Sequence, residues 1–219
     1  MTRVYIVVEG QTEESFVNEV LAPALTPRRV YLYPTLLGGK GGRVNYARVR
    51  EDVLLKLKQD RAAFCSTMLD FYGLGRGFPG TPLPPNLSNL DKVTHIEQQV
   101  KKDIIVQAPG LRPAIRFIPY LQLHEYEGLL FSDPAAFARG IYQPSLEKAL
   151  TDIRRKFTTP EDINDSTETA PSKRVLELCT GYRKPLYGAL AALEVGIEAM
   201  RRECPHFRDW VERLERIGT

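Results

Sequence analysis

The chain has few cysteines, almost no net charge and no long hydrophobic run. The three cysteines, Cys65, Cys179 and Cys204, are far apart and form no Cys-x-x-Cys pair, so the sequence indicates neither a disulfide framework nor a thiolate zinc site. Reduced thiols are typical of the cytosol. The first apolar run, residues 4–8, ends at Glu9 and is too short for a signal peptide or a membrane span. We therefore expect a cytoplasmic protein that does not contact a membrane.

The overall charge is too balanced to indicate a partner. The 30 basic residues oppose 27 acidic ones, which leaves a net charge of +3. Any surface that binds phosphate must therefore come from local clustering. The 219 residues are 43% apolar and 26% charged, which is close to the average for globular proteins and enough for a substantial core.

The spacing of the apolar residues alternates between a strand period and a helix period. Strands are predicted at residues 4–8, 30–37, 63–69 and 114–123. Three helices are predicted between them: the first starts at Thr12, the second covers 46–59 and the third covers 89–105. Helical crossovers between successive strands favour an α/β core with a mostly parallel sheet flanked by helices, over residues 1–131. Segments 134–139, 145–157, 185–200 and 207–217 are predicted to be helical, and we expect 132–219 to form a helical appendage packed on this core.

Acidic residues follow three of the predicted strands. Glu9 comes after the first strand, Asp70 after the third, and Glu125 and Glu127 after the fourth. Loops at the carboxyl ends of parallel strands converge, so these acids are expected to meet, and their mutual repulsion calls for a cation. Carboxylate oxygens favour Mg²⁺ or Mn²⁺. Each acid alone could equally be a helix cap or a salt-bridge partner, but their convergence favours a metal site.

Two basic segments are candidates for contact with phosphate. The glycine-rich segment 38–43 carries Lys40 and Arg43, and its backbone N–H groups could approach an anion, although a flexible connector would have the same composition. It is not a Walker A loop, since a glycine follows Lys40. Lys173 and Arg174 could bind nucleic acid or pair with the acids at 161, 162 and 165.

Several segments carry a resemblance to a known domain. Residues 8–14 (VEGQTEE) after a strand, followed by 69–73 (LDFYG) at the end of a later strand, resemble the TOPRIM (topoisomerase–primase) domain. Together with 124–131 (HEYEGLLF), 170–174 (APSKR) and 204–207 (CPHF), they make the chain resemble, more narrowly, a bacterial family of small TOPRIM-like proteins, domain-of-unknown-function family 4276.

The resemblance implies metal-dependent phosphodiester chemistry. It makes Glu9 an acid–base group or metal ligand and Asp70 a Mg²⁺ ligand, but Tyr72 stands where TOPRIM domains carry a second aspartate. Glu125 and Glu127 could replace that carboxylate, because residues two apart on a strand share a face. If a helix starts there instead, His124 and Glu127 share a face. Glu13, Tyr72 and His124 are secondary site candidates.

Two functions follow as hypotheses. The first is a nuclease that uses Mg²⁺ or Mn²⁺ on DNA or RNA, with Glu9, Asp70 and Glu127 catalytic and with Glu125 as a further metal ligand. Similar domains in bacterial defence systems work beside an ATPase that gates them, so the resemblance also implies an ATPase partner. The second is a non-catalytic, degenerate TOPRIM module that binds a protein or nucleotide, in which Tyr72 marks the lost ligand.

Overall fold

The computed structural model describes residues 1–37, 44–75, 77–164 and 169–218. The described residues form a parallel sheet in the order β2-β1-β3-β4, and β5 also pairs with β3. Its strands are β1 (Thr2–Val8), β2 (Val30–Leu36), β3 (Phe64–Asp70), β4 (Phe117–Ile118) and β5 (Leu121–Gln122). The predicted α/β class with a mostly parallel sheet is therefore confirmed.

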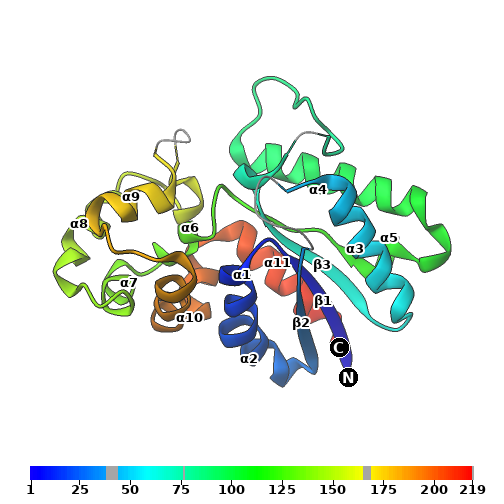
Figure 1. Cartoon of the computed structure of the whole chain (residues 1–219), viewed down its shortest axis with the longest axis horizontal. Helices are drawn as coiled ribbons and strands as arrows, with labels where there is room; N and C mark the ends of the chain where they lie inside the picture. The colour runs from blue at the N-terminus through cyan, green and yellow to red at the C-terminus, as the bar shows by residue number, and fades with distance from the viewer. Residues whose placement is uncertain (38–43, 76, 165–168, 219) are drawn as a thin grey trace.

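Helices cover both faces of this sheet (Figure 1). The α-helices are α1 (Gln11–Phe16), α2 (Ala22–Leu25), α3 (Tyr46–Gln59), α4 (Asn89–Gln107), α5 (Pro113–Arg116), α6 (Glu127–Leu130), α7 (Pro134–Gly140), α8 (Glu147–Arg154), α9 (Pro171–Leu178), α10 (Ala189–Glu203) and α11 (Pro205–Arg216). The π-helical turns η1 (Val17–Leu21) and η7 (Lys184–Gly188) join α1 to α2 and lead into α10. None of the described helices combines the length and apolar content needed to cross a bilayer.

The apolar residues of β1 divide between two hydrophobic clusters. Val4, Ile6 and Val8 pack with residues of α1, α10 and α11, whereas Val7 packs with residues of α3 and α4. Successive strand side chains point to opposite faces, and both faces of β1 are covered, so its sequence is an uninterrupted apolar run. In Figure 1, α3 and α4 lie to one side of the strands, and α1 and α2 lie to the other.

The fourth predicted strand, 114–123, is interrupted in the structure. Its first residues form α5, and β4 and β5 are separated by Pro119 and Tyr120. Pro119 has no N–H to donate, and the Thr67 hydroxyl takes the place of ladder bonds here: it accepts from the Tyr120 N–H and donates to the Tyr120 carbonyl, both at 2.9 Å. The Tyr120 ring stacks on Trp210 at 4.2 Å between centroids.

The last helix, α11, packs directly on the sheet. The Trp210 indole donates to the Ser66 hydroxyl of β3 at 2.9 Å, and Thr2 Oγ1 of β1 donates to the Ile217 carbonyl at 3.2 Å, so the two chain ends lie side by side (Figure 1). The buried Glu161 carboxylate accepts from the N–H groups of His206 and Phe207 at 3.0 and 2.9 Å and thereby caps α11. One hydrophobic cluster therefore contains residues from both halves of the chain.

Candidate functional site

The first strand ends at an acidic turn. Glu9 follows β1, and α1 begins at Gln11. Glu13, in the first turn of α1, directs its carboxylate back to this junction, where Oε2 accepts from the Gly10 N–H at 2.9 Å. The helix therefore begins before Thr12, and Glu13 rather than Thr12 supplies the side-chain oxygen at its start. Glu13 is only 7% exposed.

The end of β3 lies beside the end of β1. Val8 is in register with Met68, so Asp70 is brought next to the turn that carries Glu9. The chain then turns at Phe71–Gly73, and a Cβ on Gly73 would stand 2.5 Å from Glu9 Oε2 and 2.9 Å from Oε1. The absence of a side chain at Gly73 therefore leaves the space that the Glu9 carboxylate occupies.

The segment after β5 adds two further carboxylates. Glu127 is the first residue of α6 and is almost fully buried, and Glu125 Oε2 accepts from the Ser172 N–H at 3.0 Å. Lys184, at the start of η7, places its Nζ 3.0 Å from Glu127 Oε2 and 3.7 Å from Glu125 Oε1. The structure has a helical start rather than a strand here, and both glutamates reach one lysine.

Burial and mutual repulsion raise the pKa values of these acids. Burial raises the pKa of Asp70 well above its usual value, and the charges of Glu13, Glu9 and Glu127 add to the effect. Burial raises the pKa of Glu127 to about 7, and it raises the pKa values of Glu9 and Glu13 as well. Burial opposes the charged form of Lys184, but the nearby carboxylates, Glu127 first, raise its pKa. The four acids therefore share one electrostatic environment.

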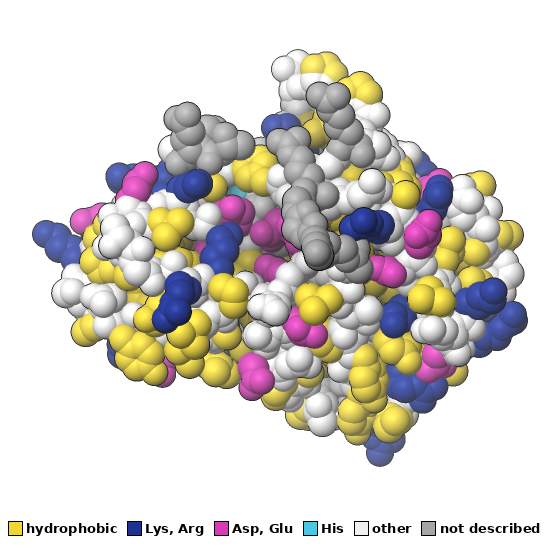
Figure 2. Space-filling model, viewed as in Figure 1, with side chains coloured by type: hydrophobic (Ala, Val, Ile, Leu, Met, Phe, Trp, Pro, Cys, Tyr) yellow, Lys and Arg dark blue, Asp and Glu magenta, His cyan; other side chains and the backbone are white. Residues whose placement is uncertain are grey.

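We call Glu9, Glu13, Asp70, Glu125 and Glu127 the carboxylate cluster. Acidic side chains gather in a hollow on the face shown in Figure 2, between the left-hand helices and the half of the molecule that carries α3 and α4. Three members of the cluster have a buried oxygen that accepts no hydrogen bond from the described residues: Glu9 Oε2, Asp70 Oδ1 and Glu127 Oε1. Such oxygens cost free energy unless a donor or a cation satisfies them.

The donor chemistry of the cluster fits a divalent cation, because Mg²⁺ and Mn²⁺ prefer carboxylate oxygens. In their present positions, however, no three His, Cys, Asp or Glu side chains of the described residues are grouped so that they could hold a metal. The Lys184 ammonium contacts two of the candidate ligands. Metal binding would therefore require side-chain rotations and a shift of Lys184.

Tyr72 and His124 pack against each other beside the cluster. Their ring centroids are 5.0 Å apart, and the Tyr72 N–H donates to the His124 carbonyl at 3.3 Å. His124 has a φ of +62°, which is uncommon for a residue with a side chain, and its Nε2 lies 3.5 Å from Asn89 Nδ2. The Tyr72 ring thus packs on an imidazole.

The basic candidates are spread over the chain. Lys40 and Arg43 lie outside the described residues. Arg174 donates to the Thr169 carbonyl at 2.8 Å and lies over the Phe157 ring, and Lys173 is exposed. The acids proposed as alternative partners of Lys173 and Arg174 are engaged elsewhere: Glu161 caps α11, Asp162 accepts from Thr159, and residue 165 is outside the described ranges.

Lys184 is the functional candidate that the sequence analysis missed. It lies 57 residues after Glu127 and follows Arg183 in a segment with no motif. The only local signal is the proline that follows it, which is typical of a helix start. Its meeting with the cluster depends on how η7 packs against α1, which the sequence pattern does not indicate.

The fold and the cluster define a class of protein: a parallel α/β protein with carboxylates gathered at the carboxyl ends of its strands. The chain belongs to the family described as "Domain of unknown function (DUF4276)", whose model matches residues 8–215. This match confirms the predicted membership of family 4276, and the matched residues include the whole cluster. No curated protein matches the chain significantly, and neither does any solved structure.

Proposed function

We propose that this chain is a metal-dependent nuclease that hydrolyses phosphodiester bonds at the carboxylate cluster. The observation that carries the proposal is the meeting of acids from three distant segments, with buried oxygens of Glu9, Asp70 and Glu127 that accept no hydrogen bond from the described residues. Protein folds rarely keep several buried carboxylates together without a function for them. The resemblance to TOPRIM domains supports the same chemistry.

The residues of the carboxylate cluster and Lys184 would have different roles in the proposed hydrolysis. Glu9, Asp70, Glu125 and Glu127 would hold Mg²⁺ or Mn²⁺, which when bound increases the acidity of water and neutralises charge on the phosphate. Glu9 is held at a defined place by Gly73, and its raised pKa makes its carboxylate a better proton acceptor near neutral pH. Lys184 supplies a positive charge beside Glu127, where the phosphate of a substrate would otherwise meet only acids.

The test compares charge-neutral variants of similar size. Glu9→Gln and Asp70→Asn should abolish cleavage of DNA, RNA or tRNA in Mg²⁺ or Mn²⁺. Glu14→Gln, in the same helix as Glu13 but outside the cluster, should cleave like the wild type. Each protein is assayed alone and together with a candidate partner ATPase. Cleavage at the wild-type rate in both of the first two variants would refute the assignment.

The second candidate is a non-catalytic partner module that binds a protein or nucleotide. It is favoured by the contacts of Lys184 with Glu125 and Glu127, which already neutralise part of the cluster without a metal. Calorimetry with Mg²⁺ and Mn²⁺ separates the two functions. Metal binding that is lost in Asp70→Asn supports the nuclease, whereas no binding at millimolar metal supports the partner module.

A further inference from the structure

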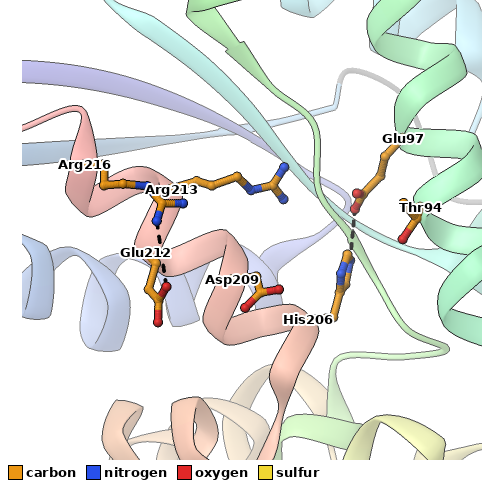
Figure 3. Close-up of a pocket in the computed structure, with 7 residues that line it drawn as sticks. All are labelled: Thr94, Glu97, His206, Asp209, Glu212, Arg213 and Arg216. Atoms are coloured by element: carbon orange, nitrogen blue, oxygen red, sulfur yellow. Dashed lines mark hydrogen bonds and ion pairs between the residues drawn. The ribbon is translucent and has the colours of Figure 1, made fainter.

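A second cleft lies between α4 and α11, lined by residues other than those of the carboxylate cluster. Its volume is about 470 Å³, within the range of small-molecule sites. Thr94 and Glu97 line it from α4, and His206, Arg213 and Arg216 are among the residues that line it from α11 (Figure 3).

The acids of this cleft already have partners. Glu97 Oε1 lies 3.0 Å from His206 Nε2 and accepts from the Leu121 N–H at 2.8 Å. Glu212 contacts Arg216, and Asp209 contacts Arg208, each at 3.9 Å. The dashed lines in Figure 3 join Glu97 to His206 and Glu212 to Arg216. Each acid that lines the cleft therefore has a partner among the described residues, and Asp209 is the exposed one.

Two cations near the cleft lack an acid partner among the described residues. Arg213 reaches from α11 into the cleft in Figure 3, and its Nε is buried and donates to no acceptor among the described residues. Lys101 follows Thr94 and Glu97 by seven and four residues on α4, which places it on the same helix face. Burial lowers the pKa of Lys101, and the charge of Arg213 lowers it further, so the two cations repel each other.

We propose that this cleft binds the phosphate monoester of a nucleotide or of a nucleic-acid end, held between Arg213 and Lys101. The Arg213 guanidinium, which reaches into the cleft, can donate two parallel hydrogen bonds to a phosphate, and a shift of its side chain would give the buried Nε–H an acceptor as well. The charge of a monoester, about −1.5 to −2 at neutral pH, matches two cations that have no acid partner in the described part of the chain. A backbone diester carries only one negative charge, so a terminal phosphate is preferred.

Calorimetric titration with four probes tests the proposal: inorganic phosphate, deoxyadenosine monophosphate, and one single-stranded oligonucleotide with and without a 5′-phosphate. We expect the first two to bind and the phosphorylated oligonucleotide to bind more tightly than its unphosphorylated form. If only the free nucleotide and phosphate bind, the site serves a nucleotide rather than a nucleic-acid end. Failure of all four to bind at millimolar concentration would overturn the proposal.

Variants test whether Arg213 and Lys101 bind the phosphate. Arg213→Gln should weaken phosphate binding about tenfold or more, because it removes a charged hydrogen bond. Lys101→Gln should weaken it as well, and Asp209→Asn should strengthen it, because a negative charge leaves the cleft. Lys102→Gln, at an exposed position of the same helix, is the control and should bind like the wild type.

Thermal unfolding of each variant establishes that it is folded. If Arg213→Gln does not fold, Lys101→Gln and Asp209→Asn carry the test, since their expected effects have opposite signs. Wild-type affinity in both Lys101→Gln and Asp209→Asn would contradict the assignment. Weaker phosphate binding in Asp209→Asn would contradict it too, because that result would indicate a site for a cationic group.

Discussion

Replacement of Lys184 by methionine should make the stability of the protein depend on divalent metal. In the structure the Lys184 ammonium contacts Glu127 and Glu125, at 3.0 and 3.7 Å. Methionine keeps a long apolar stem but removes the charge. Without metal, the variant should therefore be less stable than the wild type, because buried Glu127 loses its ion pair.

The structure also sets the size of the effect. Removal of one partner from a buried ion pair costs about 3–5 kcal/mol. Lys184 is 40% exposed, and the pKa of Glu127 is already raised to about 7, so Glu127 can take up a proton instead of remaining charged and unpaired. We therefore expect a loss of about 2 kcal/mol, which for a chain of this length lowers the Tm by about 4–8 °C.

Added Mn²⁺ should reverse this loss. At a concentration one hundred times its Kd, a ligand that binds only the folded state stabilises it by about 2.7 kcal/mol. Mn²⁺ should also bind Lys184→Met more tightly than the wild type, by about tenfold, because the competing ammonium is gone. Thermal unfolding with and without Mn²⁺, followed by calorimetry, measures both effects.

The matched control is Arg201→Met. Arg201 pairs with Glu215 through two contacts of 2.9 and 3.0 Å, outside the carboxylate cluster. This variant should lose stability without any change in its response to Mn²⁺. The reasoning fails if Mn²⁺ leaves the Tm of both the wild type and Lys184→Met unchanged.

Two further predictions concern Gly73 and His206. Gly73→Ala places a Cβ 2.5 Å from Glu9 Oε2, so the variant should keep its Tm but lose about 10²-fold of any metal-dependent cleavage; wild-type cleavage would contradict the role given to Glu9. Burial lowers the pKa of His206, but the facing carboxylates of Glu97 and Glu161 outweigh burial and the Arg213 charge and raise it above 6.5. The stabilisation from His206 is then complete below about pH 6.5 and is lost as the pH rises through the raised pKa. Urea unfolding should therefore show that the free energy of unfolding decreases over this pH range in the wild type and in His95→Gln, but not in His206→Gln. The same pH dependence of the free energy of unfolding in both variants would contradict this reasoning.

The elements that the sequence predicted best are those whose signal is local. The helix at 46–59 agrees with α3 residue for residue, and its cap, Asn45, accepts from the Ala47 N–H at 2.8 Å. The strands at 4–8, 30–37 and 63–69 lie within one or two residues of β1, β2 and β3 at each end. Each has its own apolar period and its own end signals, so no distant residue is needed to define it.

The interrupted strand could not be predicted in the same way. Pro119 alone allowed an edge strand, and the break between β4 and β5 depends on the Thr67 hydroxyl and the Trp210 ring, both far away in the chain. The start of α1 differs from the predicted start at Thr12 for a similar reason. Thr12 is a good cap by residue type, but α1 already begins at Gln11. There the Glu13 carboxylate accepts from the Gly10 N–H, in a turn formed where β1 meets the packed helices.

By itself, the sequence determined that acids follow the strands of a parallel sheet, and parallel strands bring their carboxyl ends to one edge whatever the details of packing. That is why Glu9 and Asp70 could be placed together in advance. Only the tertiary structure decided the rest: the space that Gly73 leaves for the Glu9 carboxylate, the contact of Lys184 with Glu127, and the repulsion between Arg213 and Lys101. These contacts join residues from packed elements whose relative positions come from the whole core, and no local pattern encodes them.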